Sequence, residues 1–93
     1  MIDARIKKIV DYYGDKHQIL KAVEELTELS SALIHYLDGC GDIDNIHEEM
    51  ADVSVMLEEL EYIMSWKDDA ESIVSGIRRQ KIERQLRRIE EAE

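Results

Sequence analysis

The sequence contains no proline and no phenylalanine, and only four of its 93 residues are glycine. Because proline interrupts helices and glycine weakens them, their scarcity favours long, uninterrupted helices. Residues that favour strands are also few: aromatic side chains make up 5% of the chain, and valine and threonine are rare. These absences argue against an all-β fold and predict an all-α protein.

The chain has one cysteine, Cys40, so no disulfide can form within it, and this suits a reducing cytoplasm. No segment approaches the run of about 18 apolar residues that crosses a membrane, and the first residues lack the apolar run of a signal peptide. We therefore expect a cytoplasmic protein with no membrane partner. The length predicts a single domain over 1–93, with a thin core that oligomerisation would help to complete.

The net charge is −10 at pH 7, which disfavours nucleic acid as a partner because phosphate binding needs a basic surface. The two signs are unevenly distributed. Residues 1–77 hold six Lys and Arg against eighteen Asp and Glu, whereas residues 78–93 hold six against four. The late basic residues are Arg78, Arg79, Lys81, Arg84, Arg87 and Arg88.

Apolar residues recur at intervals of three and four, which predicts amphipathic helices. We expect four of them, over 2–13, 16–37, 44–65 and 70–91, in a bundle-like arrangement with short connections. Turn-forming residues separate them, as in Asp38-Gly39-Cys40-Gly41-Asp42. The three- and four-residue spacing of apolar residues is interrupted between Ile77 and Ile82. This interruption allows a kink or a change of packing partner in the last helix.

The second and third helices each carry a regular apolar stripe, and we expect the two stripes to pack against each other in a near-antiparallel pair. The predicted stripes are Ile19, Ala22, Val23, Leu26, Leu29, Leu33 and Leu37 on one helix, and Ile43, Ile46, Met50, Val53, Leu57, Leu60 and Met64 on the other.

Acidic residues flank both stripes in a matched pattern. The second helix contains Glu24-Glu25-Leu26-Thr27-Glu28 and the third contains Glu49-Met50-Ala51-Asp52, that is, E-E-x-x-E followed by E-x-x-D. Residues three apart on a helix share a face, with Cβ atoms within about 6 Å. Glu25, Glu28, Glu49 and Asp52 should therefore meet between the helices. Two such charges ~4 Å apart repel by about 4 kcal/mol at an effective dielectric near 20, which predicts a bound hard cation such as Mg²⁺.

This acidic pattern across a helical hairpin resembles the MazG-like, all-α nucleotide pyrophosphohydrolases. The similarity extends over roughly Gln18 to Glu90. It includes the residues that lead into the first acidic motif from Gln18, the segment Glu48-Glu49-Met50-Ala51-Asp52-Val53, and a final helix that reads Lys81-Ile82-Glu83-Arg84-Gln85-Leu86-Arg87-Arg88.

The resemblance implies Mg²⁺-dependent cleavage of a nucleoside triphosphate, with Mn²⁺ as an alternative ion, to give a nucleoside monophosphate and pyrophosphate. It implies that the four acids are metal ligands and that Glu24 orients or deprotonates the attacking water. Lys81 and Arg84 would contact phosphate, and Gln18 would face the substrate. A homodimer or homotetramer is expected. One departure is that MazG domains often carry an asparagine shortly before the final-helix lysine, where this chain reads Arg78-Arg79-Gln80.

Three other interpretations remain beside this one. Phosphoribosyl-ATP pyrophosphatase, of histidine biosynthesis, is the nearest enzymatic alternative within the superfamily. A non-catalytic helical interaction module, with the acids as surface charges, is the alternative from another class. A di-iron four-helix protein is disfavoured, because none of His17, His35 and His47 lies three residues after a glutamate, as the Glu-x-x-His motif requires.

Overall fold

The computed structural model describes residues 1–93 and contains four α-helices and no strand, which confirms the all-α prediction. The helices are α1 (Ala4–Tyr13), α2 (Asp15–Leu37), α3 (Ile43–Ile63) and α4 (Ala70–Ala92). Each differs from its predicted range by at most two residues at either end. None of the four is both long enough and apolar enough to traverse a lipid bilayer.

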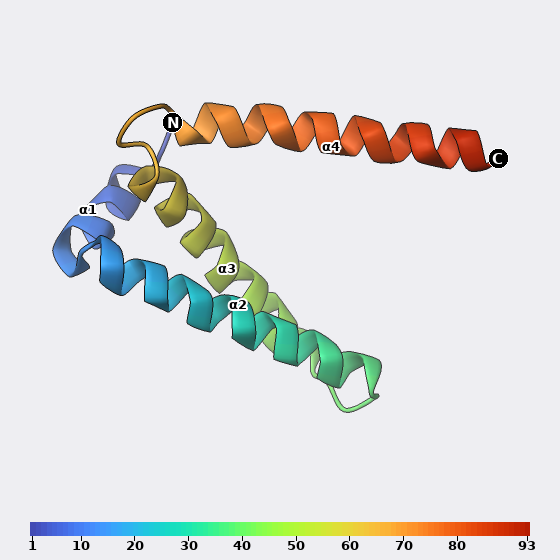
Figure 1. The fold of residues 1–93 in the computed structure, drawn as a ribbon. Helices are drawn as coiled ribbons and strands as arrows, with labels where there is room; N and C mark the ends of the chain where they lie inside the picture. The colour runs from blue at the N-terminus through green and yellow to red at the C-terminus, as the bar shows by residue number, and fades with distance from the viewer.

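The antiparallel pair α2 and α3 forms the centre of the molecule (Figure 1). Helix α1 lies at the open end of this hairpin and packs on both of its helices. The hydroxyl of Tyr62, near the end of α3, donates a 2.8 Å hydrogen bond to Asp11 of α1. The first three helices therefore form one packed unit.

A tight turn joins α2 to α3. Gly39 has φ of 82°, a left-handed conformation that glycine adopts without strain. A side chain at Gly41 would place its Cβ 2.4 Å from the Cα of Tyr36, so only glycine fits there. Asp42 then caps α3, because its carboxylate accepts a 2.9 Å hydrogen bond from the backbone N–H of Asp44.

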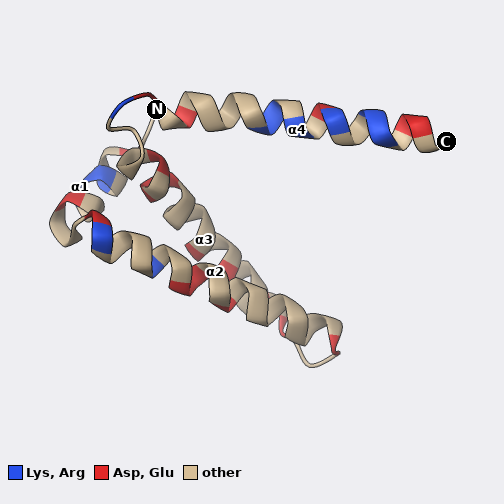
Figure 2. Ribbon diagram, in the orientation of Figure 1, with Lys and Arg blue, Asp and Glu red and all other residues tan.

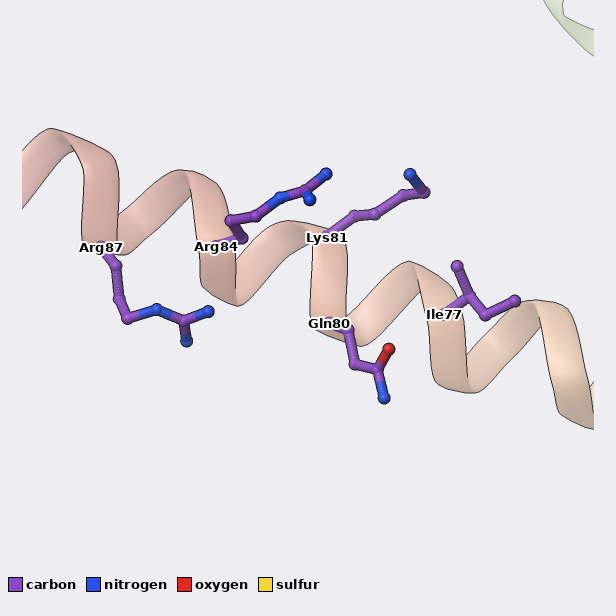
Figure 3. A pocket seen from close by; sticks show the side chains of 5 residues that line it. All are labelled: Ile77, Gln80, Lys81, Arg84 and Arg87. Atoms are coloured by element: carbon purple, nitrogen blue, oxygen red, sulfur yellow. The ribbon is translucent and has the colours of Figure 1, made fainter.

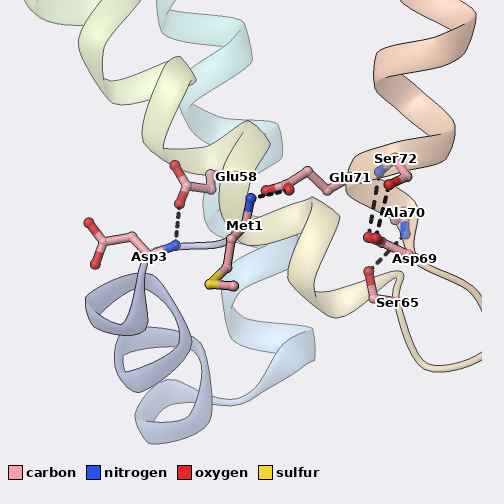
Figure 4. Close-up of polar contacts among 8 residues, drawn as sticks. All are labelled: Met1, Asp3, Glu58, Ser65, Asp69, Ala70, Glu71 and Ser72. Atoms are coloured by element: carbon pink, nitrogen blue, oxygen red, sulfur yellow. Dashed lines mark hydrogen bonds and ion pairs between the residues drawn. The ribbon is translucent and has the colours of Figure 1, made fainter.

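The connection from α3 to α4 is held by side-chain caps (Figure 4). The Ser65 hydroxyl accepts a 3.0 Å hydrogen bond from the Ala70 backbone N–H. Asp69 caps α4 and accepts from the hydroxyl of Ser72 at 3.0 Å. These bonds set the direction in which α4 leaves the hairpin.

The first residues of the chain also reach this connection. The N-terminal ammonium group of Met1 forms an ion pair with Glu71 at the start of α4. The backbone N–H of Asp3 donates a 2.9 Å hydrogen bond to Glu58 of α3. Figure 4 shows both contacts beside the capped start of α4.

Helix α4 projects away from the other three helices rather than completing a closed bundle (Figure 1). It runs without interruption from Ala70 to Ala92, and α3 is its only helical neighbour. The Cα radius of gyration is 16.2 Å, whereas a compact domain of this length has about 12 Å. Within one chain, only α1, α2 and α3 pack together as a bundle-like fold requires. The large apolar side chains of α4 are left exposed.

The prediction of which apolar residues fill the α2–α3 interface was partly wrong. Leu26, Leu33 and Met50 belong to the predicted stripes but are 42%, 45% and 55% exposed. The positions that do face the partner helix include small and polar residues as well as apolar ones. The buried residues are Gln18, Ala22, Glu25 and Ala32 on α2, and Ile46, Val53, Met56, Glu59 and Ile63 on α3.

The difference has a geometric cause. Each helix carries apolar residues over a broad arc, and periodicity alone does not determine which edge of that arc faces the partner. In the structure, Ala22 and Ala32 lie in the interface, and such small side chains permit close approach of two helices. Both helices are turned by about a quarter of a revolution from the predicted orientation.

This rotation gives the hairpin two different sides. The exposed stripe residues, such as Val23 and Leu33 on α2 and Met50 and Leu57 on α3, lie about a quarter turn from the buried face in the same rotational sense. Because the helices are antiparallel, the two exposed stripes lie on the same side, which we call the apolar side. The acidic motifs lie toward the opposite, acidic side.

The burial difference predicts unequal effects of equal substitutions. Ile46 is 5% exposed and Ile43, one turn earlier, is 52% exposed. Ile46→Ala should lower the free energy of unfolding by about 2–5 kcal/mol because it leaves a cavity in the hairpin. Ile43→Ala, the matched control, should cost much less. Urea denaturation followed by circular dichroism measures both, and equal losses would contradict this assignment of the core.

Candidate metal centre

Three of the predicted ligands converge between the two helices of the hairpin. Glu25 of α2 and Glu49 and Asp52 of α3 each offer one carboxylate oxygen, and these three oxygens lie within 4.8 Å of one another. The antiparallel pairing places the middle of α2 beside the first half of α3, which brings the two motifs to the same level (Figure 2). We call Glu25, Glu49 and Asp52 the acidic cluster.

The cluster contains carboxylate oxygens that the chain itself does not satisfy. Glu25 is 7% exposed, and its Oε2 atom is buried without a hydrogen-bond partner. The Oε2 atom of Glu49, which is half-buried, is in the same condition. Burying a charged oxygen without a partner is costly, and a cation could supply the partner that these two atoms lack.

Lys21 is the one basic side chain that pairs with the cluster. Its Nζ lies 3.2 Å from Glu25 Oε1 and 4.0 Å from Glu24 Oε2. The Glu25 carboxylate, followed by the charge of Glu24, raises the pKa of Lys21. One ammonium group balances only part of the charge of three carboxylates, and the donor set is all oxygen, which suits Mg²⁺ or Mn²⁺.

Glu28 lies at the edge of the acidic cluster rather than within it. Its side chain is exposed, and it is not among the three converging acids. The negative charge of Glu25 is nevertheless the main cause that raises the pKa of Glu28, followed by partial burial and the charge of Glu49. Glu28 therefore experiences the field of the cluster and stands where it could serve as a further ligand.

Glu24 and Gln18 line a hollow that lies along the same seam, toward α1. The hollow has a volume of about 480 Å³ and is lined by residues of α1, α2 and α3. Glu24 is exposed at its rim, and Gln18 is 4% exposed at its base. The full lining is Ile9, Tyr13, His17, Gln18, Lys21, Glu24, Met56 and Glu59.

Lys81 and Arg84 are not brought to the acidic cluster within one chain. Both are exposed on α4 and border a shallow hollow of about 360 Å³ whose lining comes from that helix alone (Figure 3). Helix α4 makes no contact with α2, and its basic half points away from the hairpin (Figure 2). Any role at the cluster requires α4 of another copy.

Sequence reasoning missed Glu59, which is 1% exposed and lines the α1–α2–α3 hollow. A signal was present, because Glu59 follows Asp52 by seven residues, or two helical turns, and so shares its face of α3. Gln18 precedes Glu25 by the same interval on α2. The matched spacing predicts that these two residues meet across the antiparallel pair, as they do.

No protein-family model, curated protein or solved structure matches the chain. The case for a metal centre therefore rests on the converging carboxylates and their unpartnered buried oxygens.

Mg²⁺ should stabilise the protein through this centre. At a concentration about 100 times Kd, a ligand that binds only the folded state adds about 2.7 kcal/mol, so the melting temperature should rise on addition of MgCl₂. Glu25→Gln and Asp52→Asn should reduce that rise because each removes a ligand charge. Glu48→Gln, which changes an exposed neighbouring acid, should retain it. Thermal denaturation with and without EDTA measures the effect, and an equal rise in all four proteins would refute the site.

Proposed function

We propose that the chain is a Mg²⁺-dependent, MazG-like nucleoside triphosphate pyrophosphohydrolase. The observation that supports this most directly is the convergence of Glu25, Glu49 and Asp52 across the hairpin, with two buried oxygens left unpartnered. These are three of the positions at which the E-E-x-x-E and E-x-x-D motifs resemble the MazG pattern. The lone, exposed Cys40 accords with a reducing cytoplasm.

The chemistry requires charge neutralisation and positioning more than a covalent intermediate. Glu25, Glu49 and Asp52, with Glu28 beside them, would hold the ion, which polarises the phosphoryl oxygens and lowers the pKa of bound water. Glu24 stands at the rim of the adjacent hollow and would accept the proton of the water that attacks the α-phosphate. The bond from the α-phosphorus to the bridging oxygen breaks, and pyrophosphate leaves.

The exposed surface supports assembly of at least two copies. The chain exposes 7462 Å², whereas a compact monomer of its mass exposes about 5,600 Å². The excess per chain is about twice the roughly 800 Å² that each partner buries in a standard interface. The apolar side of the hairpin and the apolar residues of α4, such as Ile82 and Leu86, supply the surface that another copy would cover.

The distribution of charge indicates which surface α4 would contact in that assembly. The basic end of α4 carries Lys81, Arg84 and Arg88 on one face, whereas the hairpin is strongly acidic (Figure 2). We infer that α4 of one copy lies along the hairpin of its neighbour and brings Lys81 and Arg84 toward the phosphates of the substrate. Each site would then combine an acidic metal centre from one chain with basic side chains from another.

Turnover should depend on the cluster and on metal. With Mg²⁺, the chain should convert nucleoside triphosphates to monophosphate and pyrophosphate, and EDTA should abolish the reaction. Glu25→Gln or Asp52→Asn should lower kcat/KM by at least about 10–100-fold, the loss typical when even a residue that only supports a metal ligand is removed, while helicity is retained. Product analysis by ion-exchange chromatography tests this, with Glu48→Gln as the control.

Two other results of that assay would redirect the assignment. Cleavage of phosphoribosyl-ATP alone would favour the pyrophosphatase of histidine biosynthesis. Absence of any cleavage, with unchanged assembly in EDTA, would favour a non-catalytic helical interaction module.

Sharing of the site between copies predicts complementation. Glu25→Gln and Lys81→Ala should each be nearly inactive alone. In a mixture that is unfolded and refolded together, a mixed dimer has one site with both defects and one site with neither, so activity should return to about a quarter of the wild-type value. No recovery, with mixed dimers present by native mass spectrometry, would show that Lys81 acts within its own chain or not at all.

A further inference from the structure

The α1–α2–α3 hollow contains a buried carboxylate that the proposed mechanism does not use. Glu59 is 1% exposed, yet it forms no ion pair with any basic residue of the chain. Its Oε1 atom accepts a 2.7 Å hydrogen bond from Gln18 Nε2, and its Oε2 atom takes part in no side-chain hydrogen bond. Glu59 Oε2 is not among the fully buried atoms that lack a partner, so this oxygen is free to accept a hydrogen bond from a ligand in the hollow.

Gln18 is itself held in one orientation. Since the Glu59 carboxylate can only accept, the Gln18 amide presents its nitrogen to Glu59 and its Oε1 atom to Nδ1 of His17, 2.6 Å away. This contact requires the tautomer of His17 that carries a proton on Nδ1. The His17 ring stacks on Tyr13, with centroids 5.1 Å apart and planes at 15°. The polar end of the hollow therefore presents the Glu59 carboxylate as an ordered hydrogen-bond acceptor, and the stacked rings of His17 and Tyr13 lie nearby.

The distance between the hollow and the acidic cluster is one that a single nucleotide can span. Gln18 lies seven residues before Glu25, and Glu59 lies seven residues after Asp52, so the two sites are about 10 Å apart along the helix axes. Lys21 lies between them, since it lines the hollow and pairs with Glu25. This separation suits a nucleoside whose base occupies the hollow while its first phosphates reach the metal centre. The volume of about 480 Å³ accommodates a purine nucleoside.

We propose that the hollow is a base-recognition site that selects guanine through Glu59. A carboxylate only accepts hydrogen bonds, and among the common bases guanine alone presents two adjacent donors, N1–H and the 2-amino group, on its Watson–Crick edge. Adenine and cytosine present one amino group beside an acceptor. Uracil and thymine present a single N–H between two carbonyl oxygens, which the carboxylate repels. Glu59 is thus a specificity-determining residue.

This site rests on the proposed function only in that a nucleotide is the ligand, so binding and turnover are measured separately. Isothermal titration calorimetry without metal compares GMP with IMP, which differs only in lacking the 2-amino group. GMP should bind about tenfold more tightly than IMP, because a hydrogen bond to a charged group is lost in IMP, and UMP should bind most weakly. Equal affinities for GMP and IMP in the wild-type protein would overturn the proposal.

Substitution then tests the residue. Glu59→Gln, which is nearly isosteric, should remove most of the preference for GMP over IMP, whereas Glu61→Gln, half-buried on the same helix and outside the hollow, should keep it. Circular dichroism confirms folding, and the wild-type comparison stands even where Glu59→Gln does not fold. Turnover of all nucleotides without base preference would refute guanine selection but leave the hydrolase intact. Glu59-dependent GMP binding without turnover would refute the hydrolase but leave the base site.

Discussion

The seam between α2 and α3 must accommodate carboxylates that repel one another. In an ordinary helix pair, apolar side chains occupy the central positions, and burial alone stabilises the contact. Here Glu25 is buried near the centre of the seam, close to Glu49 and Asp52, and Lys21 balances only part of their charge. The hairpin therefore buries carboxylate charge at a position suited to a cation, rather than maximising apolar burial.

The interface between α2 and α3 contains two polar sites, and in each site the residues of the two helices face each other. The acidic cluster lies at one, and the Gln18–Glu59 pair lies two helical turns away along both helices. Antiparallel helices advance at the same rise in opposite directions, so an equal interval on each keeps facing residues in register. In the proposed complex, a single elongated ligand would meet the acidic cluster at one end and the Gln18–Glu59 pair at the other, with Lys21 between them.

A single chain leaves large apolar side chains exposed on the hairpin and on α4. Only 12 of 93 residues are buried, and Ala70 is the one buried residue of α4. The positive charge of α4 and the negative charge of the hairpin are separated within one chain (Figure 2). In the assembly proposed above, association of copies would cover the apolar side and bring the opposite charges together, and assembly would thereby complete the site.

The helices and the acidic motifs could be predicted from the sequence because both depend on local spacing. Interruption by Gly14 and by the Asp38–Asp42 turn sets helix ends, and residues three apart share a helical face whatever the fold. The convergence of Glu25, Glu49 and Asp52 followed from that spacing and an antiparallel pairing. The burial of Glu59 did not, although its spacing from Asp52 was visible.

The rotation of each helix, and the path of α4, were decided only by tertiary packing. The apolar arcs of α2 and α3 are wide enough to permit more than one orientation, and the one adopted buries Ala22, Ala32, Gln18 and Glu25 and exposes Leu26 and Leu33. Periodicity in a sequence specifies a face within an angular range, whereas the contact between two surfaces selects one angle. That selection places the carboxylates in the seam and leaves the larger apolar residues for another surface to cover.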